Sequence, residues 1–209
     1  GGHGSSGCAC GDIGDESCQW LYDVVDLGSS VSLNTQSGHG IEAALRPHCE
    51  MGDPSRTLIS SDDDQVLLLI EFSELVNLKS ISMTGRGDTR VKEIKAYSNL
   101  NQRPISDFEE AERASPHAVW QVAADSADET IDLEIPGSSS RHFQQIKSLT
   151  LFVTSSHGAD LTCIGWLGLK GARTHMKLKG VLENTDYELR PTNELSIRGL
   201  EKAHQSTGF

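Results

Sequence analysis

The stretch Thr130-Ile-Asp-Leu-Glu-Ile135 shows most clearly which fold this sequence favours. Its residues Ile131, Leu133 and Ile135 alternate with polar ones, so in an extended strand these apolar side chains share one face. The same period of two recurs at residues 118–122, 149–153 and 161–169. Each of these patterns predicts a β-strand that turns one face toward a hydrophobic core.

Other stretches predict strands of a different kind. Residues 66–70 are apolar without a break and are soon followed by Phe72, which indicates a strand covered on both faces. Within residues 76–83 the apolar parity shifts between Leu78 and Ile81, which predicts a β-bulge. With a further candidate at residues 91–97, about seven strands and no long helical pattern favour an all-β, antiparallel sandwich.

Two short helical turns are predicted beside the strands. Ile41, Ala44 and Leu45 share a helical face that ends at Pro47. The stretch Ser106-Asp-Phe-Glu109 has the spacing of a capping box, with Ser106 as the expected cap and with Phe108 and Ala111 facing inward.

Composition and charge narrow the classes of partner. The 209 residues suffice for one well-buried core, and 30 acidic against 18 basic residues give a net charge of −12. This charge repels phosphate backbones and favours a basic protein surface, so we expect protein partners and no nucleic acid. No apolar run approaches the roughly 18 residues of a membrane span, so we expect no membrane association. We also expect a monomer, since no heptad pattern occurs.

Cysteine usage bears on the compartment. Five cysteines form a poor disulfide framework for a domain of this size, and no secretory signal pattern occurs at the N-terminus. We therefore expect reduced thiols and a cytoplasmic location, with the nucleus as an alternative. Composition divides the chain into a Gly/Ser/His/Cys leader without structure at residues 1–14, a folded domain at 15–183 and a polar tail at 184–209.

Several short motifs resemble those of the PITH domain family. The stretch Ser61-Asp-Asp-Asp-Gln-Val-Leu-Leu68 resembles the family's Ser-Asp-x-Asp-x-x-Leu-Leu signature. Further matches occur at Ser32-Leu-Asn34, residues 76–80, Phe108-Glu-Glu-Ala-Glu-Arg113 and residues 148–153. Together the matches span about residues 15–185 in the family's order, and the leader with His3, Cys8 and Cys10 is also similar.

The resemblance implies a jelly-roll β-sandwich, similar to galactose-binding domains, that associates with the proteasome regulatory particle. Two features of this sequence depart from other members of the family. The N-terminal thioredoxin domain and its Cys-x-x-Cys centre, which other members carry, are not found, and Ser32 stands where several relatives have cysteine. We therefore carry over no redox role.

Acidic loops are the predicted interaction surface. The residues concerned are Asp62, Asp63, Asp64, Asp107, Glu109, Glu110 and Glu112. Carboxylates at 62–64 could bind a hard cation, but no calcium-loop glycine or downstream glutamate follows, and a charged loop before a buried strand also limits edge pairing. We expect a structural or interface role and no metal.

The leader and a tripeptide offer weaker alternatives. His3, Cys8, Cys10 and Cys18 could coordinate a soft metal or act in redox chemistry, although Cys-x-Cys with one distant histidine is loose for zinc. Arg86-Gly-Asp88 matches an integrin-binding tripeptide, but within Gly85–Thr89 it is better interpreted as a turn between strands.

No catalytic residue, metal site or cofactor is predicted. The sequence has no nucleophile-elbow, His-Glu-x-x-His or phosphate-binding glycine motif. His39, His117, His142 and His157 are expected to be surface imidazoles, and Cys163 is expected to pack as a small hydrophobe. The three tryptophans are expected in the core or at its rim: Trp20, Trp120 and Trp166.

The sequence therefore predicts a non-enzymatic protein-interaction module. The alternative is a domain that binds a small ligand or saccharide at its loop ends, although only 11 aromatic residues are available to line such a site. A redox or metal-binding helper that acts through the Cys-x-Cys leader is the third hypothesis.

Overall fold

The computed structural model describes residues 18–99, 105, 107–124 and 130–177. The predicted domain boundaries at 14/15 and 183/184, and the leader residues His3, Cys8 and Cys10, lie outside the described residues. The described strands are β1 (Gln19–Trp20), β2 (Val25–Leu33), β3 (Leu58–Ile59), β4 (Val66–Thr84), β5 (Val91–Ser98), β6 (Ala118–Gln121), β7 (Thr130–Glu134), β8 (Ile146–Ser156), β9 (Cys163–Ile164) and β10 (Trp166–Lys177). The helices are α1 (Ile41–Ala44) and α2 (Phe108–Arg113), with 3-10 turns η1 (Tyr22–Val24), η2 (His48–Glu50), η3 (Gly87–Thr89) and η4 (Ser140–Phe143).

The long strand β4 connects the two layers of an antiparallel sandwich. Its first part, up to Phe72, pairs with β2 and β8, and β8 continues through β5 to β6. Its second part, from Glu74 to Thr84, pairs with β10 and β7. The pairing with β8 shifts register between Glu71 and Val76, where β4 passes from one layer to the other. The predicted strands at 66–72 and 76–83 are thus one continuous strand.

The predicted β-bulge in the second part of β4 is confirmed. Lys170 and Gly171 are neighbours on β10, but they pair with Ser80 and Leu78, which leaves Lys79 as the additional residue on β4. The backbones approach so closely here that a Cβ atom on Gly171 would lie 2.1 Å from the carbonyl oxygen of Asn77. Only glycine fits at this position.

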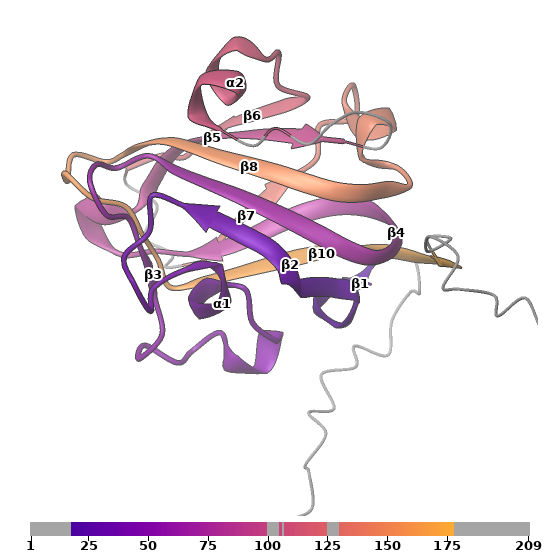
Figure 1. Ribbon diagram of the computed structural model, residues 1–209, viewed down its shortest axis with the longest axis horizontal. Coiled ribbons are helices and arrows are strands. Elements are labelled where there is room, and N and C mark those ends of the chain that lie inside the picture. Colours follow the sequence, from indigo (N-terminus) through magenta and orange to yellow (C-terminus); the bar gives the residue numbers. More distant parts are fainter. Residues whose placement is uncertain (1–17, 100–104, 106, 125–129, 178–209) are drawn as a thin grey trace, which may run out of the picture. The chain divides into compact units, whose positions relative to one another are not determined.

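Side chains from both layers fill the core. On the first part of β4, Val66, Leu68 and Ile70 are fully buried in the main hydrophobic cluster between the layers. The alternate residue Leu67 belongs to a second cluster, on the outer face, which α2 covers. The prediction of a strand covered on both faces is confirmed. In Figure 1, α2 lies on the β8–β5–β6 side of the sandwich, and α1 lies on the opposite side near β3.

Several elements differ from the prediction in detail. The strand β2 has no simple alternation and was not predicted. The strand predicted at 161–169 is divided at Gly165, since β9 pairs with β3 whereas β10 pairs with β4. Asp107, and not Ser106, caps α2, because its side chain accepts the backbone N–H of Glu110. None of the helices in the described part of the chain is long and apolar enough to cross a membrane.

Candidate functional site

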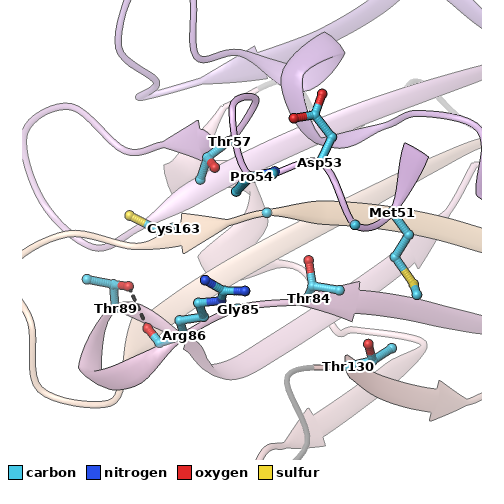
Figure 2. A pocket seen from close by; sticks show the side chains of 12 residues that line it. Met51, Asp53, Pro54, Thr57, Thr84, Gly85, Arg86, Thr89, Thr130 and Cys163 are labelled. Carbon is cyan, nitrogen blue, oxygen red and sulfur yellow. Dashed lines mark hydrogen bonds between the residues drawn. The ribbon is translucent and has the colours of Figure 1, made fainter.

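A pocket of about 240 Å³ opens beside the end of β4. Its walls come from the loop at residues 51–57, the turn between β4 and β5, the start of β7, and the junction of β9 with β10. Figure 2 shows Thr84 and Arg86 on one side of the strand that carries Cys163, with Pro54 and Thr57 on the other side. Four segments distant in sequence therefore meet at this site.

The lining of the pocket combines polar and apolar groups, and its described residues include no histidine that could act as a catalytic base. Hydroxyl groups come from Thr57, Thr84 and Thr130, and the half-buried Cys163 contributes its thiol. Cys163 thus lies in a pocket wall, whereas the sequence predicted that it packs as a small hydrophobe. Hydroxyl groups can donate and accept hydrogen bonds, so the lining suits a small polar ligand.

The buried side chain of Arg46 joins two segments of the pocket wall. Its side chain is 1% exposed, and Nη2 donates to the backbone oxygens of Asp53 at 3.3 Å, Arg56 at 3.3 Å and Gly165 at 2.8 Å. Its Nη1 lies 3.6 Å from Oδ2 of Asp53. Hydrogen bonds from Ser55, with a smaller contribution from Arg46, lower the pKa of Asp53, which remains ionised at neutral pH. Sequence reasoning missed Arg46, because nothing around it resembles a known motif.

The acidic loop at 61–64 is tied into the fold through Asn34. The side-chain Nδ2 of Asn34 donates to Oδ1 of Asp63 and to the backbone oxygen of Gln65, both at 2.7 Å. Its Oδ1 accepts the backbone N–H of Asp62 at 3.0 Å. Asn34 adopts the left-handed conformation, with φ of 59°, which asparagine tolerates better than most residues. The motif at 32–34 and the signature at 61–68 therefore meet in one structure.

Asp64 fixes the far side of the same loop. Its Oδ2 accepts the backbone N–H of Ser156 at 2.7 Å, and its backbone oxygen accepts the hydroxyl of Thr162 at 2.6 Å. Ser156 and Thr162 are both buried. Of the three aspartates, Asp62 uses only its backbone in these contacts, and its side chain is exposed.

The acidic residues of α2 are arranged differently. Oδ1 of Asp107 accepts the backbone N–H of Glu110 at 2.7 Å and caps the helix. Glu109 forms an ion pair with Arg113 on the exposed side, and Glu112 is exposed. The inner side packs through Phe108, whose ring meets that of Phe152 edge-on at 5.8 Å, as the inward-facing position predicts. The carboxylates of Asp63 and Asp64 thus bond to Asn34, Gln65 and Ser156, whereas those of Asp107 and Glu109 bond within the α2 segment.

The histidines expected at the surface are half-buried and packed instead. Nδ1 of His39 lies 2.8 Å from the backbone oxygen of Thr57, and His117 stacks on His142. The Oγ of Ser98 lies 3.0 Å from Nδ1 of His117, but the same nitrogen accepts the backbone N–H of Ser98. In a catalytic triad a carboxylate orients the ring, and within the described residues the partner of His117 is another imidazole.

Aromatic residues gather at a second place. The ring of Trp20 stacks on that of His48 with centroids 4.5 Å apart and meets that of Trp166 edge-on at 5.2 Å. Nζ of Lys170 lies over the Trp20 ring, 4.3 Å from its centroid. Trp166 is fully buried and donates from Nε1 to the backbone oxygen of Arg46. Trp20 and Trp120 are half-buried, so the three tryptophans occupy the core and its rim as predicted.

The described ranges contain no group of three or more His, Cys, Asp or Glu side chains that could hold a metal ion. Cys18, the last of the predicted leader ligands, is exposed with a free thiol, and the remaining leader ligands lie outside these ranges. The Arg86-Gly-Asp88 stretch forms a turn between β4 and β5, in which Gly87 has a φ of 58° as predicted.

Comparison with known proteins gives a family and a fold. The PITH domain family matches residues 11–191. PITH domain-containing protein 1 of Mus musculus is 29% identical over 185 residues, which cover 84% of this chain and 82% of that protein. Thioredoxin-like protein 1 of Schizosaccharomyces pombe is 31% identical over 158 residues, 74% of this chain and 51% of that protein. A Clostridium perfringens structure with two CBM32 domains and an M60 catalytic domain aligns with 71% of this chain and 14% of its own, at 12% identity and a TM-score of 0.53.

Proposed function

This chain belongs to the PITH domain family, and from that premise we propose that it is a non-catalytic domain that binds the proteasome regulatory particle or its cofactors. The family match over most of the chain carries this proposal, because the association is what the resemblance implies. The proposal also places the chain in the cytoplasm or the nucleus, where proteasomes work, and treats it as a monomer when free.

The acidic groups of this chain favour a partner with a basic surface. The net charge of −12 attracts a basic partner over a distance and raises the rate of encounter. The exposed carboxylates of Asp62, Glu109 and Glu112 are available at the surface for contacts. An open hollow of about 680 Å³ lies against α2, lined by Asp107, Phe108 and neighbouring residues. We therefore favour α2 over the 61–64 loop as the centre of the interface.

Affinity capture from a cell lysate, followed by mass spectrometry, tests the proposal. We expect the full chain to enrich subunits of the proteasome regulatory particle, and the triple variant D62N/E109Q/E112Q to enrich them less. The matched control D23N/E42Q/D160N removes the same charge from exposed positions elsewhere. Failure to recover regulatory subunits above background with the full chain would contradict the proposal. An equal loss with both variants would show that net charge alone, and not the position of these three carboxylates, matters.

The pocket beside β4 supports a second candidate function, the binding of a small hydroxylated ligand. Its threonine hydroxyls and its wall, held in place by Arg46, favour such a ligand. A thermal-shift screen of saccharides and polyols would detect it, since a ligand that binds only the folded state raises the Tm. We expect Thr84→Val to abolish that shift. A screen without any stabilising compound would reject this candidate.

A further inference from the structure

Two imidazole rings stack at the end of β5 that lies away from the pocket. His117, in the connection between α2 and β6, and His142, in η4, have ring centroids 4.4 Å apart and planes inclined by 5°. The buried ring of Phe143 meets His117 edge-on. The stack joins two connections that are distant in sequence. Parallel rings direct their nitrogen lone pairs into separate planes, so the pair does not suit a shared metal ion.

A hydrogen-bond donor faces one nitrogen of each ring. Nδ1 of His117 accepts the backbone N–H of Ser98 at 3.0 Å, and Nε2 of His142 accepts Nε–H of Arg141 at 3.2 Å. A backbone N–H can only donate, so Nδ1 of His117 carries no proton in this arrangement. A proton on Nδ1 of His117 would turn two N–H groups toward each other.

Among the described residues, no carboxylate offsets a positive charge on the His117 ring. From η4, the charged or titratable groups against the rings are His142 itself and Arg141, and the contacts from β5 and from Phe143 are uncharged. Charged side chains on the adjacent elements have partners elsewhere: Lys95 of β5 lies near Glu93, and Arg113 of α2 pairs with Glu109. Burial, and then the neighbouring His142, lower the pKa of His117.

We propose that His117, stacked on His142, is an acid-sensitive latch, which holds the connection between α2 and β6 against the end of β5 near neutral pH and releases it when His117 is protonated. Ser98 Oγ can turn to accept from a protonated Nδ1, but the Ser98 backbone N–H then loses its acceptor. The stabilisation is complete above the ordinary histidine pKa of about 6.5 and declines as the pH falls below it, toward the lower pKa of the folded state.

Amide hydrogen exchange followed by NMR on the full chain tests the latch. We expect the protection factor of the Ser98 amide to fall at least about tenfold between about pH 7.5 and about pH 5, after correction for intrinsic exchange. The amide of Val122, which donates to Lys92 near the other end of β5, should keep its protection. Unchanged protection of Ser98 across this range would overturn the proposal.

Three variants make the test specific. His117→Gln keeps an acceptor but cannot titrate, so the acid response of Ser98 should disappear. His142→Phe keeps a stacked ring but removes the second imidazole, which lowers the pKa of His117, so the response should move to higher pH. His157→Gln, which replaces another half-buried histidine, should leave the response unchanged. An acid response that persists in His117→Gln would refute the latch. If that variant does not fold, titration of the His117 ring signals in the unaltered chain decides, because an ordinary pKa there also refutes it.

Discussion

The loop at residues 61–64 carries three carboxylates and the α2 segment at 107–112 carries four, yet the two segments use them differently. In the loop, Asp63 and Asp64 accept backbone and side-chain donors from Asn34, Gln65 and Ser156. In α2, the carboxylate of Asp107 caps the helix, whereas those of Glu109 and Glu112 lie at the surface. Similar acidic composition therefore stabilises the fold in one region and leaves groups available to a partner in the other.

The difference follows from what each segment must connect. The loop at 61–64 leads into the buried first part of β4 and passes β2 and the end of β8, where backbone N–H groups need acceptors. The helix α2 has its own backbone bonds and packs on the outer face through Phe108, so its opposite side needs no internal partner. The family signature at 61–68 is thus explained by folding, and we expect interaction to depend on α2.

The largest predicted effect concerns Asn34, which joins the loop to β2. Asn34→Ala should lower the free energy of unfolding by about 3 kcal/mol, because it removes three hydrogen bonds and leaves alanine in the left-handed conformation. Asn34→Gly, which tolerates this φ, should lose about 1 kcal/mol less. Chemical denaturation measures both variants. Equal losses would show that backbone conformation contributes nothing here.

The second prediction concerns Asp64. Asp64→Ala should lower the free energy of unfolding by about 1–3 kcal/mol, since the buried amide of Ser156 loses its acceptor. Asp64→Asn keeps an acceptor oxygen and should lose less. Asp62→Ala is the matched control in the same loop, and its change should stay within about 0.5 kcal/mol. A loss at Asp62 as large as that at Asp64 would contradict the division of roles within the loop.

The sequence predicted the strands whose side chains alternate and the bulge at Lys79, because both depend on parity along one segment. It missed β2, where Ser29 and Ser30 bond to Asp26 and interrupt the pairing between Asp26 and Val31. Here side-chain hydrogen bonds replace the apolar alternation that identifies a strand.

The candidate sites were harder to predict than the strands. The pocket depends on Arg46 bonding Gly165, and the latch on His117 meeting His142. These pairs are far apart in sequence and have no local signal. The acidic residues were found by composition alone, which could not distinguish bonded carboxylates from exposed ones. The cap of α2 was misplaced by one residue, because Ser106 and Asp107 are both good capping residues.

The third prediction concerns the cap of α2. Asp107→Ala should lower the free energy of unfolding by about 1 kcal/mol, the usual effect of losing a capping side chain. The exchange of the Glu110 amide should accelerate, while the amide of Ser156 in the other region keeps its protection. Asp107→Asn retains an acceptor and should be close to neutral. If Asp107→Ala left the Glu110 amide unchanged, the cap would not stabilise this helix in solution.

The fourth prediction concerns Glu112, where we expect the smallest effect on stability. It gives the sharpest test of the difference between α2 and the loop at 61–64. Its side chain is exposed, so Glu112→Gln should change the free energy of unfolding by less than about 0.5 kcal/mol. If α2 binds a basic surface, the same substitution should slow association and make capture of the partner less sensitive to salt, because a charge at an interface rim acts mainly on the rate of encounter. Asp160→Asn, exposed but distant in sequence from both acidic segments, should alter neither property. Loss of stability without loss of binding would reverse the roles assigned to the two regions, since α2 would then be a structural element like the loop at 61–64.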